Sequence, residues 1–125
     1  MKNSRPLNLN LFTIKFPMAA IVSILHRLSG VILFIFIPAL LYLLHCSLNS
    51  ETSFTNLQNN FSPSWVKLPL WLFMAAICFH FIAGIRHLLM DMQFGMTKEG
   101  SKLSAYTVIL LAIVLILLSG YWLCC

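Results

Sequence analysis

Three long stretches of this sequence contain no Asp, Glu, Lys or Arg: residues 28–50, 68–85 and 103–125. An α-helix rises about 1.5 Å per residue, so roughly 20 apolar residues cross the hydrocarbon core of a bilayer. Only 9% of the chain is charged, whereas a soluble domain usually carries about 25% charged residues. We therefore predict a single-domain, all-α integral membrane protein of 125 residues. Its three transmembrane helices are expected at about residues 21–46, 67–92 and 103–123.

The remaining segments are polar. Residues 1–20 are expected to form a basic peripheral arm, and residues 47–66 a loop that can hold a short surface helix. Residues 93–102 contain two glycines and are typical of a compact turn. With three spans, the arm and this turn lie on the same side of the membrane.

The distribution of positive charge predicts the orientation. The side with the arm and the 93–102 turn carries most of the lysines and arginines, and the other side carries only Lys67. The positive-inside rule therefore places the N-terminus in the cytoplasm and the C-terminus outside; in a mitochondrion the equivalent inner side would be the matrix. The net charge of +5 reflects this bias and does not indicate a nucleic-acid-binding protein. The residues on the positive side are Lys2, Arg5, Lys15, Lys98 and Lys102, with Arg27 and Arg86 at its helix ends.

Ionisable residues lie in or near the ends of two of the apolar stretches. Such side chains are costly in hydrocarbon, so they mark a functional site by default. The predicted topology brings both groups toward the same membrane face. The first group is Ser23, His26 and Arg27, and the second is His80, Arg86, His87 and Asp91.

Ser23 and Arg27 are four residues apart, so they share one helix face with Gly30. The guanidinium of Arg27 is always charged and presents several donors, and the hydroxyl of Ser23 adds a further polar group. This pair suits a small oxygen-bearing ligand such as a quinone carbonyl. The alternative is that Arg27 only extends to the membrane interface.

His80 lies deeper than the other polar residues, about 10 Å further into the bilayer than His87 and on the same helix face. Ala76 and Gly84 flank His80 at four-residue steps. A haem needs an axial imidazole with little side-chain bulk around it. His87 would then face a propionate, with Asp91 orienting His87. The alternative is that His80 hydrogen-bonds between helices, and the small residues only allow close packing.

A second histidine ligand is missing from this chain. From helix rise alone, the positions level with His80 are expected near Leu33 and Ile109, and neither neighbourhood contains a histidine. His45 lies near the opposite end of the first helix. A haem with two histidine ligands therefore requires a partner chain.

Three segments carry a resemblance to a known family: RPLNLNLFTIKFP (5–17), SILHRLSG (23–30) and HFIAGIRHLLMD (80–91). They resemble the cytochrome b556 subunits of succinate dehydrogenase, the larger membrane anchors of respiratory complex II, and the bacterial branch in particular. The resemblance covers nearly the whole chain. It implies a three-helix anchor that packs in a helical bundle with a second, smaller membrane anchor.

The resemblance also implies roles for individual residues. The position of His80 corresponds to an axial ligand of haem b, whose other ligand is a histidine of the partner anchor. Ser23 and Arg27 correspond to residues of the ubiquinone site, shared with the partner anchor and the iron–sulfur subunit. His26, Arg27 and His87 are expected near the haem propionates. FAD and the iron–sulfur clusters belong to the flavoprotein and iron–sulfur subunits, which this chain would dock on the membrane.

Two alternatives remain open from the sequence. A quinol:fumarate reductase anchor occupies a similar place in the membrane but works in the reverse direction. A structural or transport subunit would use its polar residues only to join helices, and would show neither a chromophore nor a dependence on quinone.

Overall fold

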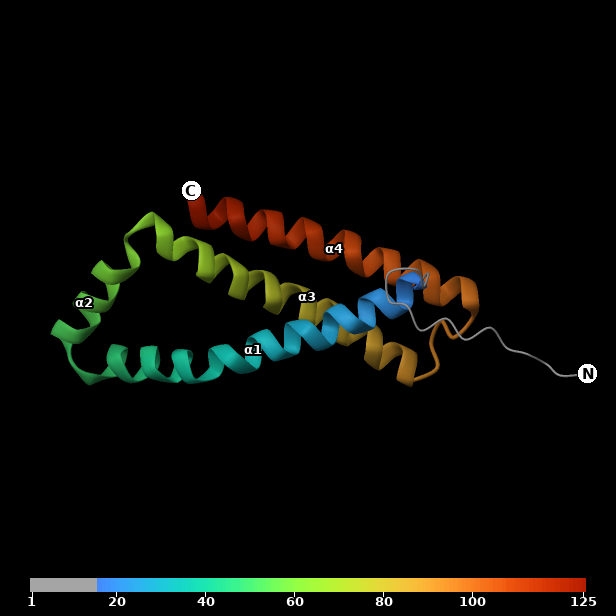
Figure 1. The fold of residues 1–125 in the computed structure, drawn as a ribbon, viewed down its shortest axis with the longest axis horizontal. Helices are drawn as coiled ribbons and strands as arrows, with labels where there is room; N and C mark the ends of the chain where they lie inside the picture. The colour runs from blue at the N-terminus through green and yellow to red at the C-terminus, as the bar shows by residue number, and fades with distance from the viewer. Residues whose placement is uncertain (1–15) are drawn as a thin grey trace, which may run out of the picture.

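The computed structural model describes residues 16–125, and the predicted arm falls almost entirely outside this range. The described part is helical and contains no strand (Figure 1). Three long helices run antiparallel to their neighbours, and the short α2 joins α1 to α3 at one end of the molecule. The helices are α1 (Met18–Asn49), α2 (Glu51–Phe61), α3 (Lys67–Asp91) and α4 (Lys98–Cys124), with a 3₁₀ turn at Ser64–Val66 before α3.

The three long helices are long and apolar enough to cross a membrane. The segments Met18–Asn49, Ser64–Asp91 and Lys98–Cys124 have mean hydropathies of 2.4, 2.1 and 2.5 in their most apolar windows. The prediction of an all-α chain with three membrane-spanning helices is thus confirmed. The polar segment between the first two spans holds the short helix α2.

The helix ends differ in detail from the expected ranges. α4 begins at Lys98 rather than near residue 103. The reason is a local cap, because the Thr97 side chain accepts a hydrogen bond from the Gly100 backbone N–H at 3.0 Å. The turn before it is correspondingly short and contains two residues with positive φ, Gln93 (66°) and Gly95 (68°). Part of the expected polar turn is therefore the first turns of α4.

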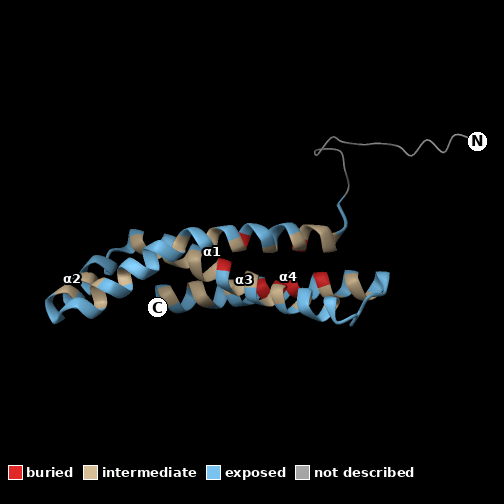
Figure 2. Cartoon of the chain, turned by 90° about the horizontal axis from the view of Figure 1, so that it is seen from below, coloured by how far each residue is buried: buried red, intermediate tan, exposed pale blue. Residues whose placement is uncertain are grey.

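The core of the bundle is thin and built from small side chains. Val22 of α1, Ala83 of α3, and Ala105 and Val108 of α4 form its buried cluster. Small residues let helix backbones approach closely, which is how helices pack in membranes. Most of the remaining surface of the long helices is exposed (Figure 2), including large apolar side chains such as Phe81. This outward apolar surface is that of helices surrounded by lipid or by other helices.

Candidate functional site

Three histidines come together where the N-terminal half of α1 packs against the C-terminal half of α3. The N-terminal half of α1 and the C-terminal half of α3 lie at the same end of the bundle, with the start of α4 beside them (Figure 1). α1 contributes His26, and α3 contributes His80 and His87. The sequence places the two polar groups toward the same membrane face, and in the structure these three imidazoles lie at the same end of the bundle.

The imidazole of His80 is held by two oxygen atoms of α1. Its Nδ1 lies 3.0 Å from Ser29 Oγ and 3.2 Å from the His26 carbonyl oxygen. The Ser29 hydroxyl donates to the same carbonyl at 2.7 Å. Because a carbonyl oxygen only accepts and the Ser29 hydroxyl donates to that carbonyl, we assign the ring hydrogen of His80 to Nδ1 from these partners. The lone pair of His80 is therefore on Nε2.

This tautomer suits a histidine that binds a metal through Nε2. Ligating histidines almost always donate their second ring N–H to a carbonyl or carboxylate, which fixes the ring and raises its basicity. In residues 16–125 no hydrogen bond to Nε2 of His80 is found, so that atom is available to a ligand. The residues present at this position thus fit an axial ligand of a haem.

Gly30 makes the close approach of His80 possible. A Cβ atom at residue 30 would lie 3.1 Å from Cε1 of His80, which is tighter than ordinary van der Waals contact. Gly84 plays a similar part from the other helix, because a Cβ there would lie 3.4 Å from Nε2 of His26. In this chain the space beside Gly84 is taken by the His26 ring, and Ala76 is buried.

The three rings form a stack. The His26 and His80 ring centroids are 4.3 Å apart with planes inclined by 12°, and those of His26 and His87 are 6.0 Å apart at 23°. Two rings that lie face to face cannot direct their Nε2 atoms at one metal from opposite sides. The described residues also contain no group of three or more metal-ligating side chains that could hold a free ion. The geometry therefore does not place His26 and His80 on opposite sides of one metal ion.

The structure corrects one expectation about depth. His80 was expected level with Leu33 of the first helix, but its contacts are with His26, Ser29 and Gly30. Helix rise fixes distances along one helix only, whereas the pairing of two helices is set by which small residues interlock. Here Val22 of α1 and Ala83 of α3 belong to one buried cluster, and this packing aligns the two helices.

The other predicted site residues are less constrained. Ser23 is half-buried on α1 and Arg27 is exposed. Nε2 of His87 lies 3.7 Å from Oδ2 of Asp91, and both side chains are largely exposed. That distance exceeds a hydrogen bond, so Asp91 does not fix the ring of His87.

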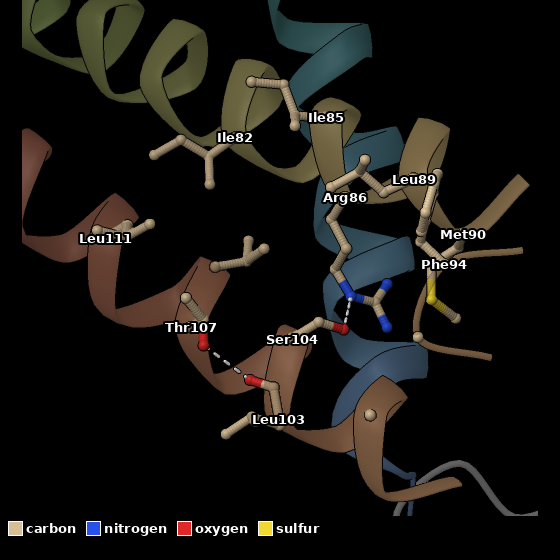
Figure 3. Close-up of a pocket in the computed structure, with 13 residues that line it drawn as sticks. Ile82, Ile85, Arg86, Leu89, Met90, Phe94, Leu103, Ser104, Thr107 and Leu111 are labelled. Atoms are coloured by element: carbon tan, nitrogen blue, oxygen red, sulfur yellow. Dashed lines mark hydrogen bonds between the residues drawn. The ribbon is translucent and has the colours of Figure 1, made fainter. Parts of the chain in front are cut away.

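Sequence reasoning did not anticipate two polar contacts. The contact of Ser29 with His80 cannot be read from the sequence, because a helical serine normally bonds only to the backbone of its own helix. Arg86 was not given a role, yet its guanidinium joins α3 to α4 (Figure 3). Its Nε donates to Ser104 Oγ at 3.0 Å, and its Nη2 donates to the Ser101 carbonyl oxygen and Oγ at 3.2 and 3.3 Å. The sequence feature that could have indicated this contact is the pair Ser101 and Ser104, three residues apart at the start of the third apolar stretch.

Arg86 also borders a cavity of about 410 Å³ between α3 and α4. Its other walls are mainly apolar and include Ile82, Leu89 and Leu111 (Figure 3). None of the three stacked histidines lines this cavity. It is therefore separate from the histidine cluster.

The fold and the site together define a multi-pass membrane protein with a histidine cluster packed between two of its helices. The chain belongs to the succinate dehydrogenase/fumarate reductase transmembrane subunit family, which it matches over residues 1–119. It is 43% identical over 123 residues to the succinate dehydrogenase cytochrome b556 subunit of Coxiella burnetii, covering 98% of each chain.

More distant relatives carry the same name. The cytochrome b556 subunit of Rickettsia prowazekii is 30% identical over 116 residues, covering 93% of this chain and 90% of the relative. That of Paracoccus denitrificans is 30% identical over 125 residues, covering 94% and 91%. The family resemblance inferred from the sequence motifs is confirmed.

Proposed function

We propose that this chain is a membrane-anchor subunit of succinate:quinone oxidoreductase that shares a haem b with a second anchor and forms part of the ubiquinone-reduction site. The observation that carries the proposal is His80, whose Nδ1–H is held by Ser29 and the His26 carbonyl while Nε2 is left for a ligand. The cytochrome b556 name of the relatives supports the assignment of haem b.

The haem would be held by residues in the N-terminal half of α1 and the C-terminal half of α3. His80 would bind the iron, and His26, Arg27 and His87 would be donors near the propionates. When bound, a haem supplies one-electron redox chemistry. Because His26 stacks on His80 and so does not face it across one iron, a second histidine ligand would come from the partner anchor.

Quinone would bind beside Ser23 and Arg27. The exposed guanidinium of Arg27 orients and polarises one carbonyl, and the Ser23 hydroxyl hydrogen-bonds to it. Reduction of the quinone to quinol takes two electrons and two protons. The electrons come from succinate through the FAD and iron–sulfur clusters of the partner subunits, and the protons from water or a partner chain.

The site would face the cytoplasm, and the chain would lie in the inner membrane of a bacterium. Lys98 and Lys102 begin α4 at the end of the bundle that holds the histidine cluster, while Lys67 begins α3 at the opposite end. The positive-inside rule then places the cluster, the iron–sulfur subunit and the flavoprotein subunit on the same side.

A reduced-minus-oxidised absorbance spectrum tests this function. Membranes that express the chain with its genomic neighbours should show a b-type α-band, and His80→Ala should abolish or shift it. His45→Ala is the matched control, because His45 is a histidine of the same helix as His26 but lies near the opposite end of α1. An assembled wild-type complex without the band, or a band unchanged in His80→Ala, would contradict the haem assignment.

The family description also includes fumarate reductases, so a quinol:fumarate reductase anchor is the second candidate. Succinate:quinone and quinol:fumarate activities of the same purified complex distinguish the two. A complex with neither activity and no haem would favour a purely structural membrane subunit.

A further inference from the structure

We propose that Ser29 is a positioning residue for the haem: it holds the His80 imidazole in its ligating tautomer and orientation, and thereby lowers the midpoint potential of the haem. This inference rests on the proposed function, because it requires His80 to be the axial ligand. It assigns a role to a side chain that touches the ligand histidine rather than the haem itself.

Burial is the first observation in its favour. Ser29 is 5% exposed and is the one buried polar side chain in residues 16–125. A polar group buried between helices is stable only when its hydrogen-bonding groups have partners. Ser29 has two, one in its own helix and one on α3.

The direction of these hydrogen bonds gives Ser29 its role. Its hydroxyl proton points to the His26 carbonyl oxygen, so its lone pairs face His80 Nδ1. The Nδ1–H is thus shared between two acceptors, at 3.0 and 3.2 Å. A flip of the ring would put a carbon where Nδ1 lies and would lose both bonds. Ser29 and the carbonyl therefore fix both the tautomer and the ring orientation.

The same contact affects the electronic properties of the ligand. Hydrogen-bond acceptors at Nδ1–H raise the basicity of Nε2, and such outer contacts tune the metal. A more basic imidazole stabilises ferric haem over ferrous haem, which lowers the midpoint potential. Removing the Ser29 oxygen should therefore raise it.

Two other serines show that the second contact is specific. Ser47 in α1 donates to the Leu44 carbonyl at 2.8 Å, and Ser119 in α4 donates to the Ile116 carbonyl at 2.8 Å. Both repeat the bond within the helix that Ser29 makes, and in residues 16–125 neither hydroxyl bonds to a second helix. Ser47→Ala is thus a matched control, because it removes the same local bond from the same helix.

The experiment is a potentiometric titration of the haem in the purified, assembled complex. In Ser29→Ala we expect a more positive midpoint potential, with at least a twofold change in the ferric-to-ferrous equilibrium, or about 18 mV at 59 mV per tenfold for one electron. The electron paramagnetic resonance g-values of the ferric haem should also change. Ser47→Ala should match the wild type in both measurements.

Two further variants test the inference if the complex that carries Ser29→Ala does not assemble. Ser29→Thr keeps the hydroxyl, and Ser29→Cys replaces the oxygen by a weaker acceptor. A wild-type potential in Ser29→Thr with a raised potential in Ser29→Cys supports the inference, and a wild-type potential in both overturns it.

The outcomes also separate this inference from the proposed function. Loss of the haem band in His80→Ala together with an unchanged potential in Ser29→Ala would overturn the role of Ser29 alone. An assembled wild-type complex without haem would overturn both.

Discussion

The two halves of α3 are held against neighbouring helices in comparable ways, but only the C-terminal half, which we call the histidine end, offers chemistry. At the histidine end, His80 bonds to oxygens of α1 and lies against Gly30. At the opposite end, the Trp71 indole N–H donates to the Ile116 carbonyl of α4 at 2.9 Å and lies against Gly120. Each end thus combines a glycine, an aromatic ring and a hydrogen bond to a neighbouring helix.

The difference lies in what remains after these bonds are made. An indole has a single N–H, so Trp71 has no polar atom left for a ligand. An imidazole has two nitrogens, so fixing Nδ1 of His80 leaves Nε2 with a lone pair. The same combination of a glycine and a cross-helix hydrogen bond therefore only stabilises the bundle at Trp71, whereas at His80 it also leaves Nε2 for a ligand. Substitutions at the two ends should separate these roles.

The largest effect is expected from Arg27→Ala, at the histidine end. Loss of a charged donor to the quinone carbonyl removes about 1.5–3 kcal/mol, or roughly 10–100-fold in the rate of quinone reduction. Succinate oxidation with an artificial dye as acceptor should be nearly unchanged, because FAD and the clusters are in other subunits. Lys67→Ala, at the opposite end of the bundle, is the charge-matched control. Equal loss of both activities in Arg27→Ala would indicate an assembly defect and not a quinone contact.

An intermediate effect is expected from Gly30→Ala. The new Cβ would lie 3.1 Å from Cε1 of His80, so the ring must shift by a few tenths of an ångström away from its two acceptors. Disturbing the contacts that orient a metal-binding side chain lowers the affinity for the metal by about tenfold or more. The haem-to-flavin ratio of the purified complex should fall accordingly. A wild-type ratio and spectrum would show that α1 does not constrain the ligand.

The smallest effect is expected from Gly120→Ala, at the indole end. A Cβ there would lie 2.9 Å from Nε1 of Trp71, so the indole must move and its bond to Ile116 weakens. The loss of one neutral hydrogen bond costs about 1 kcal/mol. We expect a lower thermal inactivation temperature of the complex with an unchanged haem spectrum. A changed spectrum would show that the two ends are coupled.

Much of the site was predictable from local sequence, since residue type and spacing along one helix suffice for it. The positions of His26, His80 and His87 at one end of the molecule followed from charge-free runs that force alternating spans. The contact between His80 and Ser29 could not be predicted in this way, because it depends on the relative position of α1 and α3 along their axes. Arg86 is a similar case, since its serine partners lie on a different helix.

The sequence by itself determined the number of spans, the all-α fold and the family, because apolar length and local motifs are properties of one segment at a time. The tertiary structure decided which residues face each other across helices. It placed His80 level with His26 and not with Leu33, and it began α4 at Lys98. The physical reason is that helix register is set by the interlocking of small side chains such as Val22, Ala83 and Ala105. No spacing along a single helix encodes that register.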